Sequence, residues 1–122
     1  GRRVWGFAND DSHLLSEDVN MGWNMVCTAD RSVAGLMDAF QRGCFYGSTG
    51  LTIDNITVTG NSIKVEAANA DRIIAFHHVG REIAHVEGSS LEIEVTEKSK
   101  YVRFECLGHG LQAAWTQPFY IS

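Results

Sequence analysis

Asp11 and His13 are the two side chains whose types and spacing could bind a metal ion, because only Ser12 separates them. If the backbone is extended there, residues i and i+2 point to the same side, and a carboxylate oxygen and an imidazole nitrogen can converge on one cation. Catalytic metal sites typically use three or more protein ligands plus water. On spacing alone, we therefore favour the simpler interpretation that Asp11 caps a turn and His13 lies in a solvated loop.

A second group of polar side chains, Tyr46, Ser48 and Thr49, lies in a glycine-flanked segment. These hydroxyls form a candidate substrate loop that could reach a phosphate. The alternative is a polar turn that links a helix to a sheet. The three cysteines are an odd number at irregular spacing without a Cys-x-x-Cys pair, so we predict reduced core residues rather than a disulfide framework or a zinc site.

The first fifty residues are predicted to form a strand, a polar loop, a second extended run and one helix. Residues 4–8 and 21–28 are the extended runs, and Asn9 to His13 is polar. Asp30 is a plausible N-cap and Gly43 a plausible left-handed C-cap. Between them an apolar stripe has helical spacing and comprises Val33, Leu36, Met37 and Phe40. These elements are too few to bury themselves, so they must pack against something else.

From residue 51 onward the apolar period changes to two. Segments 63–67, 91–95 and 102–106 alternate apolar and polar side chains, which is typical of half-buried antiparallel strands. Turn signals divide this part into about seven strands at the spacing of a β-sandwich. Gly60-Asn61 is the strongest hairpin signal, and Pro118 predicts a sheet edge or a bulge.

Length and charge limit the function. The chain has 122 residues and a net charge of −5, so a complete catalytic barrel of about 250 residues cannot fit, and neither nucleic acid nor an anionic membrane is an expected partner. No apolar run is long enough to span a bilayer and no signal peptide is recognisable, so we expect a soluble, cytoplasmic protein.

Several segments resemble, in order, the PHP family of metal-dependent phosphoesterases, which is named for polymerase and histidinol phosphatase. GFANDDSH at residues 6–13 is similar to the family's last metal-binding motif, an Asp-x-His after a late strand of a distorted β/α barrel. GW at 22–23, RGCFYGSTG at 42–50 and AWTQP at 114–118 are similar to segments of a subgroup with an added C-terminal β-domain.

The resemblance implies that Asp11 and His13 are ligands in a site of two or three divalent metal ions, such as zinc, manganese, magnesium or iron. The family's other ligands lie upstream of this motif, and nothing before Val4 supplies them. The downstream histidines do not replace them, because His77 and His78 are neighbours in a predicted strand and should point to opposite faces.

We therefore expect a mainly β chain. Residues 1–50 would be a strand-loop-strand-helix remnant of a PHP β/α barrel, and residues 51–122 an immunoglobulin-like antiparallel β-sandwich. The chain would be the C-terminal portion of a phosphoesterase, inactive alone and without a tightly bound metal. Its expected partners are a phosphoester substrate, the missing N-terminal barrel and a second copy of the chain. The alternative is a non-catalytic β-sandwich module that binds a glycan or a protein, or that serves docking or oligomerisation.

Overall fold

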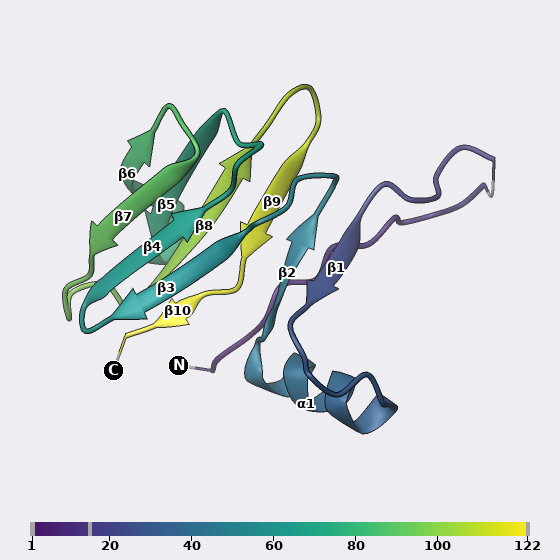
Figure 1. Ribbon diagram of the computed structural model, residues 1–122, viewed down its shortest axis with the longest axis horizontal. Coiled ribbons are helices and arrows are strands. Elements are labelled where there is room, and N and C mark those ends of the chain that lie inside the picture. The colour runs from purple at the N-terminus through teal and green to yellow at the C-terminus, as the bar shows by residue number, and fades with distance from the viewer. Residues whose placement is uncertain (1, 15, 122) are drawn as a thin grey trace.

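The computed structural model describes residues 2–14 and 16–121 and is mainly β, with antiparallel sheets, as the sequence predicted (Figure 1). The larger sheet has the order β1-β2-β9-β8-β5-β6, and β10 also pairs with β8. Its strands are β1 (Trp23–Val26), β2 (Phe45–Ser48), β5 (Arg72–His77), β6 (Arg81–Val86), β8 (Tyr101–Leu107), β9 (Ala113–Thr116) and β10 (Phe119–Tyr120). The smaller sheet has the order β3-β4-β7, with β3 (Asn55–Thr59), β4 (Ser62–Glu66) and β7 (Ser90–Glu94).

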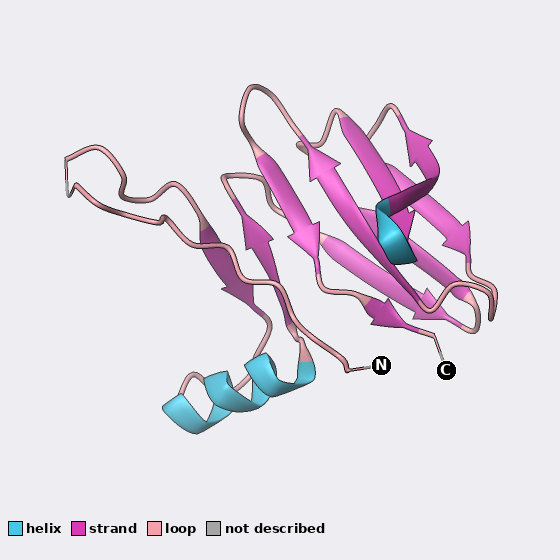
Figure 2. Ribbon diagram, turned by 180° about the vertical axis from the view of Figure 1, so that it is seen from behind, coloured by secondary structure: helices cyan, strands magenta, loops and turns pink. Residues whose placement is uncertain are grey.

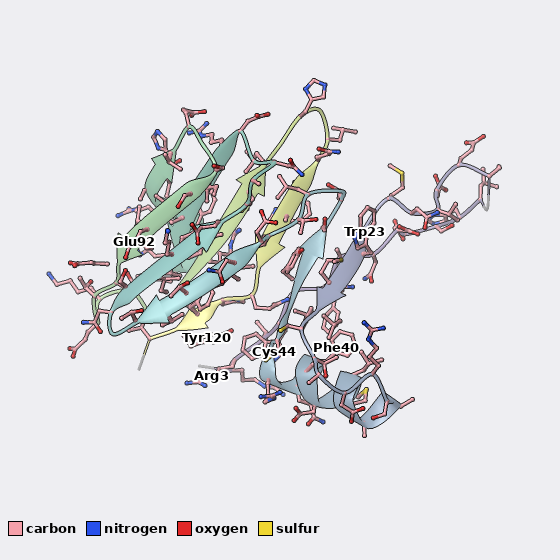
Figure 3. All side chains as sticks on the ribbon, in the orientation of Figure 1. Arg3, Trp23, Phe40, Cys44, Glu92 and Tyr120 are labelled. Carbon is pink, nitrogen blue, oxygen red and sulfur yellow. The ribbon has the colours of Figure 1, made fainter. Side chains whose placement is uncertain are left out.

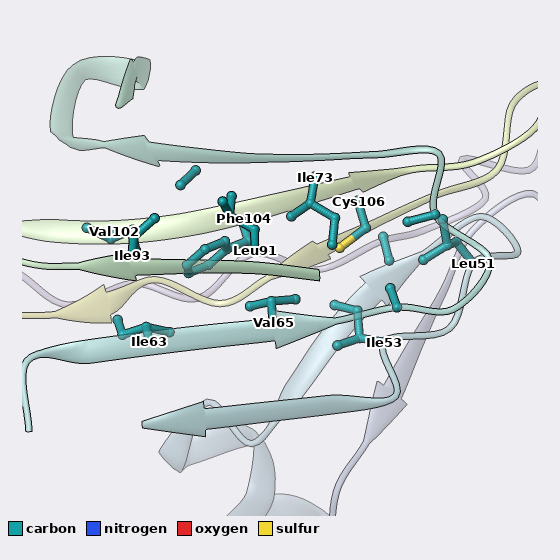
Figure 4. Packing of buried hydrophobic residues seen from close by; sticks show 14 residues of the cluster. Leu51, Ile53, Ile63, Val65, Ile73, Leu91, Ile93, Val102, Phe104 and Cys106 are labelled. Atoms are coloured by element: carbon teal, nitrogen blue, oxygen red, sulfur yellow. The ribbon is translucent and has the colours of Figure 1, made fainter. Parts of the chain in front are cut away.

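The hydrophobic core lies between the two sheets (Figure 4). Alternate side chains of β4 and β7 face alternate side chains of β5 and β8, which confirms the period of two predicted for residues 63–67, 91–95 and 102–106. Phe104 is the largest side chain that is fully buried. The core cluster as a whole draws its buried members from residue 51 onward.

Two turn predictions are also confirmed. Thr59 pairs with Ser62 across the β3–β4 hairpin, and Gly60 has a φ of 58°, a left-handed value that glycine adopts without steric cost. Pro118 interrupts the last run between β9 and β10, both of which pair with β8. Proline has no N–H to donate, so it is tolerated at this break in the ladder.

Helix α1 (Val33–Arg42) ends as predicted but begins at a different cap. Gly43 has a φ of 72° and its N–H binds the last turn, so it is the left-handed C-cap. The N-cap is Ser32, whose side chain accepts a hydrogen bond from Gly35 N, and the prediction of Asp30 was wrong. Asp30 acts one step earlier, because its carboxylate accepts bonds from Ser32 N and Oγ and so orients the cap.

The apolar stripe of α1 is only partly covered. Phe40 packs against Phe7 and Phe45, with ring centroids 5.5 and 5.1 Å away. Val33 is 79% exposed and Met37 52% exposed, so half of the predicted stripe faces solvent. The element therefore has apolar surface that this chain leaves uncovered.

The first fifty residues join the rest through one sheet. Strand β2 pairs with both β1 and β9, so the larger sheet continues from the β1–α1–β2 corner into the strands beyond residue 51 (Figure 2). Consequently the corner and the C-terminal strands are held together by a hydrogen-bonded ladder. Among the helices of the described residues, α1 included, none has the length and apolar character needed to cross a bilayer.

Candidate functional site

The segment that leads to Asp11 is extended, but it is not a strand of either sheet. Side chains from elsewhere in the chain hold its backbone, and each of them forms hydrogen bonds with both the N–H and the C=O of one segment residue. Gly6 N donates to Gln117 Oε1 at 2.8 Å, and Gln117 Nε2 donates to Gly6 O at 2.7 Å. Asn24 holds Ala8 in the same way, at 3.0 and 2.9 Å. The predicted strand over residues 4–8 is therefore an extended segment bound by amide side chains instead of a β-ladder.

A third grip lies at Val4. Its N–H donates to the hydroxyl of Tyr120 at 2.8 Å, and that hydroxyl donates to the Val4 carbonyl at 2.9 Å. The residues held in this way, Val4, Gly6 and Ala8, alternate along the segment, so the hydrogen bonds all lie along one of its edges. At the opposite edge, the backbone groups of Trp5 and Phe7 have no hydrogen-bond partner within residues 2–14 and 16–121. One edge of the segment is thus open.

Asp10 closes the loop that carries the candidate ligands. Its carboxylate accepts hydrogen bonds from the backbone N–H groups of Asn20, Met21 and Gly22, at 2.8, 2.7 and 2.8 Å. These bonds, that from Gly22 above all, hold the pKa of Asp10 below its ordinary value. Sequence reasoning missed this role, although an acidic residue in a polar loop commonly binds backbone N–H groups in this way.

Asp11 departs from the geometry on which the spacing argument rested. Its φ is 51°, so the backbone is left-handed and not extended at this position. The inference that residues i and i+2 point to the same side therefore does not apply, and the turn-capping role falls to Asp10 instead of Asp11. Asp11 itself is exposed, and its carboxylate has no hydrogen-bond partner in the described part of the chain.

The backbone contact of His13 favours one tautomer of its neutral ring. Its Nδ1 lies 2.7 Å from the backbone oxygen of Asp11, and because a carbonyl can only accept, Nδ1 must carry the proton. In the neutral ring, Nε2 then has the free lone pair. A bond from one ring nitrogen to a backbone carbonyl is the arrangement that orients metal-ligating histidines. Asp18 supports the loop, since its carboxylate accepts bonds from His13 N and Leu14 N.

Tyr46 and Ser48 lie in β2 and not in the predicted loop, Thr49 follows this strand, and the fold occupies all three hydroxyls. Tyr46 Oη accepts a bond from Ile53 N at 3.1 Å. Ser48 is buried and donates to Leu51 O at 2.7 Å. Thr49 Oγ1 donates to Leu111 O at 2.7 Å. All three brace the chain where it passes from β2 to β3, and their role with substrate stays a prediction.

His77 and His78 do not point to opposite faces, so that prediction was wrong. His77 ends β5, whereas His78 begins the short 3-10 turn His78–Gly80, and their rings meet edge to face with centroids 4.5 Å apart. The turn is possible because Val79 adopts a left-handed φ of 68°. Burial, then the nearby His78 and Arg81, lower the pKa of His77 below its ordinary value.

Over the residues that it describes, the structure does not gather a set of metal ligands around Asp11 and His13. Among the described residues, no three His, Cys, Asp or Glu side chains gather closely enough to hold a metal ion together. Asp11 and His13 supply a carboxylate and an imidazole on a loop that extends away from both sheets (Figure 1). Comparison with protein-family models, with curated proteins and with solved structures yields no match for this chain.

Proposed function

We propose that this chain is the C-terminal part of a metal-dependent phosphoesterase of the PHP kind, in which Asp11 and His13 bind a divalent cation. The observation that carries the proposal is the hydrogen bond between His13 Nδ1 and the Asp11 carbonyl, which leaves Nε2 available as a ligand. The carboxylate of Asp11 is exposed on the same loop. The resemblance of residues 6–13 to the family's last metal-binding motif supports the same assignment.

The donor set suits the metals that the resemblance implies. A carboxylate oxygen and an imidazole nitrogen together fit zinc, manganese or iron, and the carboxylate alone also suits magnesium. When bound, such a cation would activate water and offset the charge that develops on the phosphoryl group. Two protein ligands hold a cation weakly, so we expect the isolated chain to be inactive and the remaining ligands to come from another part of the enzyme.

Two features of the first fifty residues support packing against the rest of a barrel. The extended segment 4–8 leaves one backbone edge open at Trp5 and Phe7, so a neighbouring strand could pair there. Most of the large hydrophobic side chains that are exposed also lie in this part, and they include Phe7, Met25 and Met37. Exposed apolar surface of this kind commonly marks an interface.

The order of the C-terminal strands supports the immunoglobulin-like part of the proposal. The smaller sheet, β3-β4-β7, corresponds to strands A, B and E of that fold. In the larger sheet, β9-β8-β5-β6 corresponds to G, F, C and C′. We propose that this domain serves as a docking support, since Gln117, between β9 and β10, and Tyr120 in β10 hold the segment that leads to Asp11.

Manganese binding to the chain itself tests the assignment. In the NMR spectrum, added Mn²⁺ should broaden the resonances near Asp11 and His13 first, because a paramagnetic ion affects its nearest neighbours most. Asp11→Asn and His13→Ala should each remove this selective broadening. Asp71→Asn and His109→Ala, which alter exposed residues elsewhere, should preserve it. Broadening spread evenly over the acidic surface, or unchanged in both loop variants, would contradict the proposal.

A further inference from the structure

Two cysteines face each other where β1 and β2 meet α1. The last assigned pair of these strands is Val26 with Phe45, so the next residues in register are Cys27 and Cys44. Cys27 N donates to Cys44 O at 2.9 Å, which shows that the ladder continues through this pair. Residues directly opposite each other in an antiparallel ladder carry their side chains on the same face of the sheet.

That face is accessible. A groove of about 600 Å³ lies between the β1–α1–β2 corner and the C-terminal strands, and both cysteines line it. Met25 and Tyr46, which lie two residues away on the same two strands, line it as well, and so do the intervening Val26 and Phe45. Cys27 is exposed and Cys44 is half-buried beside α1 (Figure 3). The sequence-based prediction that all three cysteines are core residues was therefore wrong for this pair.

Ideal antiparallel geometry gives this pair a Cα separation in the range of disulfides. Opposite residues at a hydrogen-bonded antiparallel position have Cα atoms about 5.5 Å apart. Disulfides form at Cα separations of about 4.4–6.8 Å. Opposite Cβ atoms in an antiparallel ladder lie about 4.5–5.5 Å apart, whereas a disulfide needs about 3.5–4.5 Å, so the two strands must approach each other slightly at this last position. Cys44 N donates to Ala39 O and not to Cys27 O, so a single backbone hydrogen bond holds the pair at the end of the ladder.

Cys106 provides an internal contrast. It is fully buried in β8, and burial raises the pKa of its thiol to about 12. Because the thiolate is the reactive form, this cysteine should be inert in the folded protein. The chain thus has one pair of accessible, facing thiols and one thiol that the core protects.

We propose that Cys27 and Cys44 form a site of reversible thiol–disulfide exchange with a low-molecular-weight disulfide such as oxidised glutathione. The thiolate of Cys27 attacks one sulfur, forms a mixed disulfide and releases one glutathione thiolate. The thiolate of Cys44 then attacks the sulfur of Cys27 and releases the second glutathione. The protein loses two protons and two electrons, and oxidised glutathione is reduced to two glutathione molecules.

The cross-link would close the connection formed by residues 28–43, which contains α1 and its caps. It would also fasten β1, whose Asn24 holds Ala8 through two hydrogen bonds. Oxidation should therefore stiffen the support of the segment that leads to Asp11. This consequence depends on the cysteine pair alone and does not require the proposed phosphoesterase activity.

The test is to incubate the folded chain with glutathione redox buffers and to map its thiols by mass spectrometry. We expect the chain to lose two hydrogen atoms, with one disulfide between the peptides of Cys27 and Cys44, a free Cys106, and reversal by dithiothreitol. In Cys44→Ser the second step is blocked, so the chain should retain one glutathione on Cys27. Cys27→Ser should form no internal disulfide.

Three results would overturn the proposal. The first is stable glutathione adducts on both cysteines of the wild-type chain without an internal disulfide. The second is a disulfide that includes Cys106, because this would show that exchange occurs in an unfolded population. The third is no reaction of Cys27 or Cys44 while near-ultraviolet circular dichroism shows a folded chain. The map of the wild-type protein reports all three outcomes, so the test does not depend on the folding of a variant.

Discussion

Gln117 holds Gly6 by both polar atoms of its side-chain amide, although the two residues are 111 positions apart in the sequence. The amide accepts from the Gly6 N–H and donates to the Gly6 carbonyl, as a neighbouring strand would. Tyr120 and Asn24 repeat this arrangement at Val4 and Ala8. The end of the chain therefore helps to position the segment that leads to the candidate metal ligands.

Gln117→Leu should loosen that segment. The substitution keeps the approximate size of the side chain but removes two hydrogen bonds from a buried position. At about 0.5–1.5 kcal/mol for each bond, the free energy of unfolding should fall by about 1–3 kcal/mol. Amide exchange at Gly6 should also become faster.

Urea unfolding and hydrogen exchange measure these two effects. Gln41→Leu is the matched control, because Gln41 lies on the exposed face of α1 and its side chain makes no hydrogen bond within the described residues. Equal stability of the two variants would show that the two hydrogen bonds between Gln117 and Gly6 contribute nothing to the stability of the fold.

Asp10 should close the loop over residues 9–22 at neutral pH and release it only in acid. Its folded-state pKa is lowered by bonds from Gly22, Asn20 and Met21, so its contribution is fully present above the ordinary value of 3.8. The contribution is lost as the pH falls through the lowered pKa, because the protonated carboxyl accepts these bonds less well.

Hydrogen exchange at Asn20, Met21 and Gly22 measures loop closure. Asp10→Asn should accelerate exchange at these amides at pH 7, because an amide side chain has one acceptor oxygen where the carboxylate has two. Asp11→Asn, one residue away, should leave them protected. Acceleration of similar size in both variants would show that loop charge, and not the three bonds, closes the loop.

His77 should titrate below an ordinary histidine. Its pKa is lowered first by burial and then by the charges of His78 and Arg81. Folding therefore favours the neutral ring. The contribution of this ring to the stability of the fold is fully present above the ordinary pKa of 6.5 and is lost as the pH falls through the lowered pKa. Arg81→Gln should raise the pKa of His77, as measured by NMR titration of the ring protons, whereas Arg31→Gln should not change it.

Met37→Asp should distinguish the isolated chain from the complete enzyme that we propose. Met37 is 52% exposed here, so the free energy of unfolding of this chain should change by no more than about 0.5 kcal/mol. In the full-length protein the same change should lower the unfolding temperature, because we expect α1 to pack there against the barrel. Phe40→Ala should weaken both forms, since Phe40 packs against Phe7 and Phe45. An equal effect of Met37→Asp in both forms would contradict the proposed interface.

The strands of the core were predictable because their pattern is local. Alternation at residues 63–67 and 91–95, the turn at Gly60 and the left-handed cap at Gly43 each depend on residues close in sequence. The cap at Ser32 was missed because Asp30 is an equally good N-cap by type, and only the side-chain geometry decides between them.

The support of the candidate site was not predictable from the sequence. The partners of Gly6 and Val4 are Gln117 and Tyr120, and no local pattern identifies side chains that far along the chain as backbone partners. The facing of Cys27 and Cys44 depends on the register of β1 against β2, which the sequence alone leaves open. The left-handed φ of Asp11 likewise removes the extended backbone that the spacing argument for Asp11 and His13 took as its condition.

The most direct measurement is the phosphoesterase turnover of the longer enzyme that we propose, assayed on p-nitrophenyl phosphate with added Mn²⁺. We expect Asp11→Asn and His13→Ala each to lower turnover by about 100-fold or more. Loss of a ligand weakens the binding of the cation and also misplaces the water that the cation activates. Asp71→Asn and His109→Ala should keep nearly normal turnover, since both residues are exposed and lie outside the loop. Nearly normal turnover in both Asp11→Asn and His13→Ala would show that residues 6–13 form only a turn and that the metal assignment is wrong.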